Sequence, residues 1–452
     1  LSRHRWSVAA AAAAVVLLAT STVIATVQAR RARQERDRAE QVVSLLTSMF
    51  ESANPRAQRG AAVTVRDVLD RGVDRVRNEL RGQPETKAAL LYQLARVYRQ
   101  LGFLEQARAL FSEGLDVQQA SSKTSREAVL SARMLGVILT ELGRADSAIV
   151  LLRGAVAQTK ENEGGETIEY ANAVRDLAFA LQVAGKRDEA RDMYNRALAV
   201  WRFRHDTANA DVARLLHNLG WLASARGQSD SAEVYFRRAL ALRRQLLGDR
   251  SPDVTSTMTA LVTLLKRSGR ANDAEPIARE VLAIDRTIYP PAHAQIGTDL
   301  LSVATVQSAR HADAEADSLF REAQQVFDAL REESPMLRAQ AQNDYAIFLA
   351  ERRRFAEAEP LYASALDVYR SRFGETHVNT DVVRTNLAWV IASLGRPAEA
   401  VRLYSGTVAR LEQALPATDQ RVGQTTIDYG TALLGAGSFG EAEKVLRHAL
   451  EL

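Results

Sequence analysis

The sequence of 452 residues contains no cysteine and only ten prolines. Without cysteine the chain cannot form disulfides, thiolate zinc sites or cysteine nucleophiles. The scarcity of proline leaves long stretches free to be helical. Aromatic residues make up only 6% of the chain, but hydrophobic residues reach 46% and charged residues 25%. This balance is that of a folded protein and not of a disordered one.

Most of the chain also lacks an excess of charge of either sign. The net charge of +4 belongs to residues 1–40, where seven arginines stand against three acidic residues. Residues 41–452 hold 52 basic and 52 acidic residues and are therefore neutral. A neutral body has no net field to hold a phosphate backbone, so we expect no nucleic acid partner.

Residues 6–27 contain no charged side chain. As a helix they would extend roughly 33 Å, enough to cross a hydrocarbon layer of about 30 Å. Trp6 at one end and arginines at both ends are typical of membrane interfaces. We therefore expect residues 1–33 to be a membrane anchor with basic flanks. A cleaved signal peptide and a buried soluble helix are the alternatives.

Residues 34–84 are expected to form juxtamembrane helices and an N-terminal cap. Residues 34–50 place their apolar side chains on one face of a helix. Residues 63–80 form a second amphipathic helix, for which Thr64 is a suitable N-cap. This second helix has no partner of its own, so we expect it to cover the first of the repeats that follow.

One alanine recurs along the rest of the chain at a nearly constant interval. The first interval is 41 residues and the others are 42, and the positions are Ala107, Ala148, Ala190, Ala232, Ala274, Ala316, Ala358, Ala400 and Ala442. A Leu-Gly, Leu-Ala or similar pair lies twelve to thirteen positions before each alanine, and a bulky residue usually follows four positions after it. Such a period indicates a stacked array of helix pairs and not one closed core. We expect residues 85–452 to form about nine such repeats.

The unit around Ala190 shows the chemistry of the pattern. A first helix ends at Gly185, which readily adopts the left-handed backbone that terminates helices. Asp188 and Glu189 then open a second helix, where acidic side chains suit the helix dipole. Small residues at Ala178 and Ala190 let two antiparallel helices approach closely.

This pattern resembles the tetratricopeptide repeat, which implies an all-α, right-handed helical solenoid of helix-turn-helix units. The 42-residue interval resembles the repeats of kinesin light chains, as do Asn218–Gly220 (NLG) and Asn386–Ala388 (NLA). Leu247–Pro252 (LGDRSP) and Phe373–Val378 (FGETHV) match part of that family's turn. The resemblance implies the repeat type and not a motor-related role, because the chain has no motor-binding coiled coil.

The chain as a whole also resembles the C-terminal half of bacterial membrane serine/threonine kinases. The resemblance rests on the span followed by Phe50–Pro55 (FESANP), Thr64–Gly72 (TVRDVLDRG), Gln83–Glu85 (QPE) and repeats. It implies a single-pass protein of a bacterial inner membrane with extracytoplasmic repeats, lying after a kinase domain. Leu1 in place of methionine fits a part of a longer protein.

Two observations qualify this resemblance. Five arginines follow the span and only two precede it, which by the positive-inside rule favours cytoplasmic repeats. The sequence contains no kinase motif, so we expect no enzyme activity in this chain. The alternatives are therefore a membrane-anchored scaffold or sensor, the non-catalytic part of a kinase, and a periplasmic scaffold without a kinase.

The motifs that could indicate catalysis or ligand binding are better explained as parts of the helical repeats. Gly435–Gly440 (GAGSFG) matches a nucleotide-binding pattern, but Gly437 falls on the helix-ending glycine of the last repeat. The seven histidines have no ligand spacing, so we expect neither metal nor cofactor. His311 and Arg353 replace the helix-ending glycine in two repeats, and we expect strained turns there.

The expected function is binding of a protein or peptide in the concave groove lined by the first helix of each repeat. Arginine and asparagine side chains there can hydrogen bond to a peptide, and tryptophans can anchor an apolar side chain. The alternative is that the tryptophans pack between repeats and the polar residues are only solvated. The candidate residues are Arg133, Asn172, Arg175, Arg214, His217, Asn218, Trp221, Asn343, Asn386 and Trp389.

Overall fold

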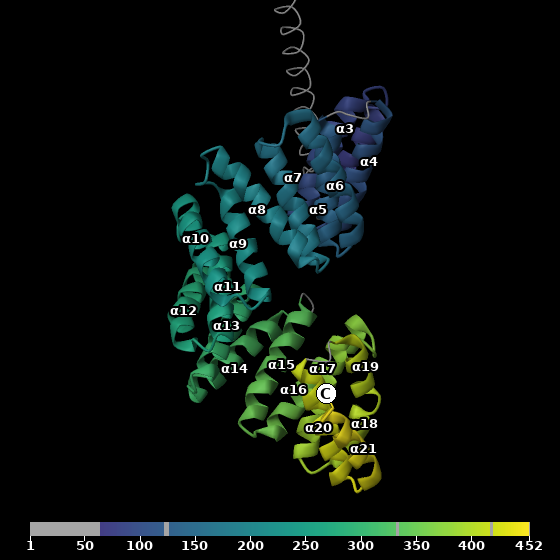
Figure 1. The fold of residues 1–452 in the computed structure, drawn as a ribbon. Helices are drawn as coiled ribbons and strands as arrows, with labels where there is room; N and C mark the ends of the chain where they lie inside the picture. The colour runs from purple at the N-terminus through teal and green to yellow at the C-terminus, as the bar shows by residue number, and fades with distance from the viewer. Residues whose placement is uncertain (1–63, 122–125, 331–333, 416–418, 452) are drawn as a thin grey trace, which may run out of the picture. The chain divides into compact units, whose positions relative to one another are not determined.

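The computed structural model describes residues 64–121, 126–330, 334–415 and 419–451 (Figure 1). These residues form helices joined by short turns and contain no strand, which confirms the all-α prediction. The helices divide into two compact units, one ending at Thr207 and the other beginning at Ala208. Each unit is described by itself.

The predicted membrane span at residues 6–27 and the predicted helix at residues 34–50 lie outside the described residues. Within the described ranges, no helix combines the length and apolar character that crossing a membrane requires.

The first unit contains the N-terminal helix and three helix pairs. Its helices are α2 (Val65–Glu79), α3 (Pro84–Gln100), α4 (Leu104–Ser121), α5 (Arg126–Glu141), α6 (Ala145–Glu163), α7 (Ile168–Val183) and α8 (Arg187–Phe203).

The second unit contains six further pairs. Its helices are α9 (Ala210–Ala225), α10 (Ser229–Leu247), α11 (Pro252–Arg267), α12 (Ala271–Ile288), α13 (Ala294–Ala309), α14 (Asp313–Ala329), α15 (Pro335–Glu351), α16 (Phe355–Phe373), α17 (Val378–Ser393), α18 (Pro397–Tyr404), α19 (Thr407–Ala414), α20 (Gln420–Gly435) and α21 (Phe439–Ala449). The described pairs number nine, as the alanine period predicts.

Helix α2 packs against α3, the first helix of the first pair. Thr64 caps α2 with a capping box, in which Thr64 Oγ1 accepts from the Asp67 backbone N–H at 3.2 Å and Asp67 Oδ2 accepts from the Thr64 N–H at 2.9 Å. The helix buries one apolar face that includes Val73 and Val76 and contacts α3. The Tyr98 hydroxyl of α3 donates a hydrogen bond to Asp70. Helix α2 is therefore an N-terminal cap.

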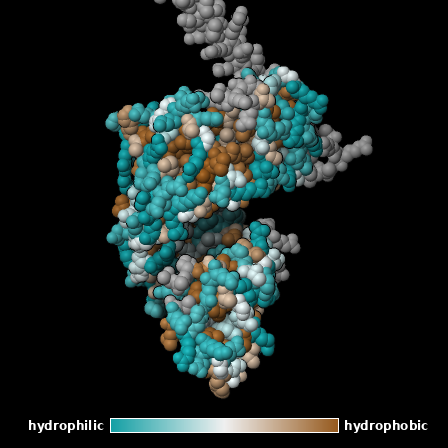
Figure 2. Space-filling model, turned by 45° about the vertical axis from the view of Figure 1, so that its right-hand side comes forward, coloured by the Kyte–Doolittle hydropathy of each residue, from teal (hydrophilic) through white to brown (hydrophobic). Residues whose placement is uncertain are grey.

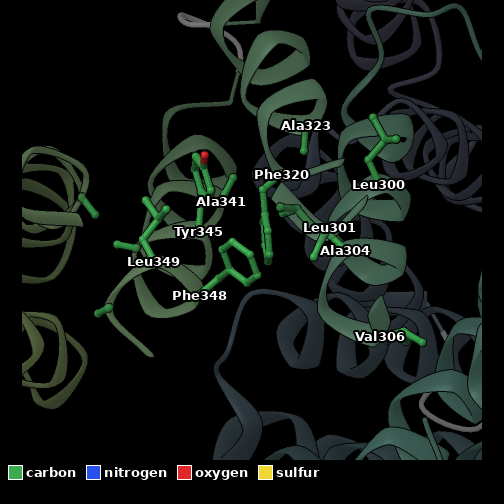
Figure 3. Packing of buried hydrophobic residues seen from close by; sticks show 14 of the residues in the cluster. Leu300, Leu301, Ala304, Val306, Phe320, Ala323, Ala341, Tyr345, Phe348 and Leu349 are labelled. Atoms are coloured by element: carbon green, nitrogen blue, oxygen red, sulfur yellow. The ribbon is translucent and has the colours of Figure 1, made fainter. Parts of the chain in front are cut away.

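The repeating alanines stand at the closest approach of the two helices in each pair. All nine are 0% exposed. The bulky residue four positions later joins one pair to the next, as Phe320 of α14 shows (Figure 3). Its ring lies against Ala304 of α13, and its centroid is 5.3 Å from that of Tyr345 and 5.1 Å from that of Phe348 on α15. Within each unit, a second helix that is followed by another pair thus packs between the first helix of its own pair and the first helix of the next.

In the fifth pair, the small residue of the first helix and the large residue of the second helix are exchanged in size, so the side-chain volume at their contact is kept. Twelve positions before the repeating alanine, the other pairs have alanine or glycine, but this pair has Val262. Four positions after the alanine, where other pairs have a large side chain, this pair has Ala278. Both residues belong to the same buried cluster. A larger side chain on the first helix compensates for a smaller one on the second, as close packing requires.

The turns between paired helices have a left-handed residue, usually glycine, such as Gly185 at a φ of 75°. His311 and Arg353 adopt the same backbone, with φ values of 59° and 60°. Their N–H groups still bond to Ser308 O and Ala350 O, at 3.0 and 2.9 Å. The predicted strain at these two turns is confirmed, and it costs about 1–2 kcal/mol at each residue.

The second helices of neighbouring pairs are joined at the surface by ion pairs about 36 residues apart in sequence. Arg153 Nη2 lies 2.6 Å from Glu189 Oε2, and Arg244 Nη2 lies 2.6 Å from Glu280 Oε1. Because these side chains are exposed, each pair contributes at most about 1 kcal/mol. Because they recur regularly, these ion pairs help to align neighbouring second helices at the surface, and they do not stabilise the buried core.

The eighth pair departs from the regular repeat, because its second helix is broken into α18 and α19. Ser405 has an extended backbone with ψ of 122°, and Gly406 is left-handed with φ of 73°. Helix α19 is held by Arg410, whose Nε and Nη2 lie 2.8 and 2.7 Å from the carboxylate of Asp381. Asp381 is buried on α17 and also pairs with Arg384.

Candidate functional site

In each unit the backbones of the first helices of neighbouring pairs approach one another closely, whereas the second helices of neighbouring pairs are linked by surface ion pairs such as Arg153–Glu189 and not by close backbone packing. The first helices therefore form the inner layer of the curve, and the second helices the outer layer. The inner face of the second unit is the exposed side of its first helices, α9, α11, α13, α15, α17 and α20. The surface seen in Figure 2 mixes apolar and polar residues, so single exposed apolar side chains are ordinary and only clustered ones indicate a site.

The predicted residues Asn386 and Trp389 line a hollow on the inner face. Its volume is about 730 Å³, and it lies between α17 and α20, with Leu411 of α19 at its edge. Trp389 is 36% exposed, and its ring meets Phe355 edge-on at a centroid distance of 5.4 Å. Phe355 thus supports the indole, and about a third of the tryptophan stays exposed to a ligand.

Trp221 occupies the same repeat position on α9 as Trp389 does on α17. It is also 36% exposed, and its Nε1–H donates to His217 Nε2 at 3.1 Å. The rings of His217 and Trp221 rest edge-on against the buried ring of Phe236, at centroid distances of 5.6 and 5.9 Å respectively. Burial, assisted by the charge of Arg243, lowers the pKa of His217 to about 4. His217 is therefore neutral at pH 7 and suited to accept the indole N–H.

Three predicted residues of the first unit lie together around one buried carboxylate, that of Asp176. Arg175 Nη2 lies 2.8 Å from Asp176 Oδ1, and Arg133 Nε lies 3.4 Å from Asp176 Oδ2. The Asn172 side-chain oxygen accepts from Arg175 Nη1 at 2.8 Å. Arg175 is buried and engaged in these contacts, so it is less available to a ligand than the sequence pattern predicts.

The remaining predicted residues are distributed along the second unit. Arg214 is exposed and lies 3.9 Å from Asp211. Asn218 is half-buried beside Trp221 on α9. The Asn343 side-chain amide is half-buried on α15 and donates to Asp344 Oδ1 at 3.3 Å. The structure therefore brings Asn386 together with Trp389 in one hollow and His217 together with Trp221, but Asn343 lies apart from both on α15.

Sequence reasoning missed the acidic members of the inner face. Asp428 and Ile427 of α20 line the hollow beside Trp389. Asp344 lines a second hollow of about 540 Å³ with Phe348 of α15. Asp344 and Asp428 stand fourteen positions before their repeat alanines, as Asn218 and Asn386 do. This shared position in the repeat could have identified both aspartates as inner-face residues from the sequence.

Neither the histidines nor the glycine-rich segment forms the ligand site that its residue types could suggest. Among the residues that the structure describes, no group of three histidine, aspartate or glutamate side chains is placed to hold a metal ion. Gly437 forms the left-handed turn after α20 with a φ of 80°, and the residues before it are helical. The glycine-rich segment is thus a repeat turn and not a phosphate-binding loop.

A family model described as tetratricopeptide repeat matches residues 86–161, 169–245, 227–287 and 337–413. Because these segments cover more than half of the sequence, the chain belongs to the tetratricopeptide repeat family. A search among curated proteins found no match.

Several solved structures are similar to the chain. BtubC (BKLC) from P. vanneervenii is 19% identical, with 58% of this chain and 90% of that chain covered and a TM-score of 0.40. A putative kinesin light chain with nearly identical repeats, from Podosopora anserina, is 15% identical over 54% and 95%, with a TM-score of 0.29. A signal transduction ATPase with a tetratricopeptide repeat sensor, from Pyrococcus horikoshii, is 11% identical over 76% and 52%, with a TM-score of 0.50. At these identities the likenesses concern the fold alone.

Proposed function

We propose that the inner face of the second unit binds a peptide or a segment of a partner protein. The observation that carries this proposal is the repetition of an exposed, supported tryptophan at the same position of two repeats. Trp221 and Trp389 are each 36% exposed, and Trp389 opens into the 730 Å³ hollow. Tryptophans held rigidly beside polar side chains are the residues that most often dominate binding energy at interfaces.

The proposal predicts that Trp389→Ala weakens peptide binding by more than tenfold, because the variant removes the largest side chain that lines the hollow. Binders are selected from a phage-displayed library of random peptides on the full chain in detergent. Their affinities are then measured against the wild type, Trp221→Ala and Trp389→Ala.

Phe439→Ala is the matched control, because Phe439 is an exposed aromatic residue at the start of the second helix α21, away from the inner face. It should leave the affinity unchanged. Circular dichroism melting of each variant separates lost binding from lost folding. Selected peptides that bind both tryptophan variants as tightly as the wild type would contradict the proposal.

The second candidate function is the sensor or scaffold part of a membrane receptor, including one that carries a kinase domain upstream. The observation in its favour is the order of the chain, in which the uncharged stretch at residues 6–27 precedes the Thr64–Gly72 motif. That motif begins α2, the helix that caps the array. In this proposal residues 6–27 anchor the protein in a bacterial inner membrane with the repeats outside the cytoplasm.

Protease treatment of intact spheroplasts tests this arrangement. We expect the repeats to be digested in intact spheroplasts, because an extracytoplasmic array is accessible to the protease before lysis. A cytoplasmic protein serves as the control for spheroplast integrity. Repeats that survive until lysis would instead place the array on the cytoplasmic side, as the five arginines after the span favour.

A further inference from the structure

The hollow beside Trp389 has an unbalanced charge. Two charged side chains line it, Arg421 and Asp428. The guanidinium of Arg421 is occupied by Asp419, with Nε 2.9 Å from Oδ1 and Nη2 2.7 Å from Oδ2. The carboxylate of Asp428 receives only the side-chain amide of Gln424, at 2.9 Å from Oδ1. Among the described residues, no cationic side chain forms an ion pair with Asp428.

The second hollow provides an internal comparison. Asp344 occupies in it the position that Asp428 occupies two repeats later. The charge of Lys266 acts on Asp344 and favours its ionised form. Burial raises the pKa of both aspartates, but for Asp428 only an uncharged amide opposes the rise. Of the two aspartates, Asp428 is therefore the one on which no cationic side chain of the described residues acts.

Apolar surface lies next to this carboxylate. Ile427 is 44% exposed and Trp389 is 36% exposed, and both line the same hollow as Asp428. Lysine and arginine side chains combine an aliphatic stem with a cationic head. A cation is also attracted to the face of an indole ring. An acidic side chain, by contrast, would face the charge of Asp428 with no free arginine to compensate it.

We propose that this hollow receives a lysine or arginine side chain of the partner peptide, with the cation on Asp428 and the stem against Trp389 and Ile427. This inference rests on the proposed peptide-binding function and specifies the chemistry of the partner. It assigns to the inner face a preference for basic segments over acidic or neutral ones.

The test uses the same library and the full chain in detergent, with Asp428→Asn and Asp428→Lys added. We expect the peptides selected on the wild type to share a basic position. We also expect Asp428→Lys to weaken these peptides by at least about tenfold, because it places like charges together. A peptide in which that basic residue is changed to glutamate should recover affinity for Asp428→Lys and lose it for the wild type.

Asp367→Lys is the control, because it makes the same change in net charge at an exposed position of the second helix α16. Peptides that require Trp389 but show no basic position, or that tolerate Asp428→Lys, would overturn this inference and leave the proposed function standing. Selection that yields no binder, or binders indifferent to both tryptophans, would overturn the proposed function and this inference with it.

Discussion

Replacing Gly220 with alanine should destabilise the protein by about 2 kcal/mol, although alanine is normally the better helix residue by about 1 kcal/mol. Gly220 lies within α9, and a Cβ atom there would stand 2.7 Å from Cδ1 and Cε1 of Phe236. The Phe236 ring is buried and in contact with His217 and Trp221. The ring therefore cannot retreat without disturbing the tryptophan proposed to bind the partner.

Gly154→Ala is the matched control for this prediction. Gly154 is exposed within α6, and no atom lies within 4 Å of its ideal Cβ position. Alanine there should stabilise the protein by about 0.5–1 kcal/mol through helix propensity alone. Urea or thermal denaturation of both variants measures the opposite signs.

A double-mutant cycle identifies the cause. In a Phe236→Ala background the ring is gone, so Gly220→Ala should become neutral or stabilising. If Gly220→Ala destabilises equally in both backgrounds, the contact with Phe236 is not the reason. The requirement for glycine at position 220 would then have a cause other than the Phe236 ring.

Raising the pH from about 5 to about 8 should destabilise the wild type relative to Asp299→Asn by up to about 1.4 kcal/mol per pH unit. Asp285 of α12 is 0% exposed and Asp299 of α13 is 1% exposed. Burial, together with the hydrogen bond and charge of Asp285, raises the pKa of Asp299 to about 8. The amide of Gln295, 2.9 Å from Asp299 Oδ1, opposes this rise.

The direction follows from proton binding. Between about pH 4 and about pH 8, Asp299 is protonated in the folded protein and ionised in the unfolded chain. The folded state therefore binds one more proton, and its stability falls as the pH rises through that window. The proton would also serve the buried Asp285, whose carboxyl oxygens have no other hydrogen-bond partner among the described residues, because a protonated Asp299 can donate to it.

Thermal melting of the wild type and Asp299→Asn across this pH range measures the effect. Asparagine keeps the shape and stays neutral, so the variant should lose this part of the pH dependence. Asp367→Asn, at an exposed position of α16, matches the change in net charge and should follow the wild type. Parallel curves for the wild type and Asp299→Asn would show that Asp299 does not hold the extra proton.

The repeat architecture was predictable from the sequence because each repeat depends on contacts between residues close in the chain. The alanine at the helix crossing, the bulky residue four positions later and the left-handed turn all lie within one unit. His311 and Arg353 illustrate this most clearly. Their place in the period predicted a positive φ for residues that do not favour it, and the backbone has it.

The break between α18 and α19 could not be predicted in this way. Ser405 and Gly406 would be tolerated in the helix at a modest cost. The break is stabilised by Arg410, which reaches the buried carboxylate of Asp381 on the preceding first helix. That contact joins residues 29 positions apart, so its presence depends on how the two helices pack.

The sequence by itself determined the family and the nine helix pairs, because these follow from a local period. Only the tertiary structure decided which polar side chains are occupied and which are open. It buries Arg175 against Asp176, pairs Asp285 with Asp299 and leaves Asp428 without a cation. The physical reason is that the state of a polar group depends on burial and on partners from other helices, and neither is written in the period of a repeat.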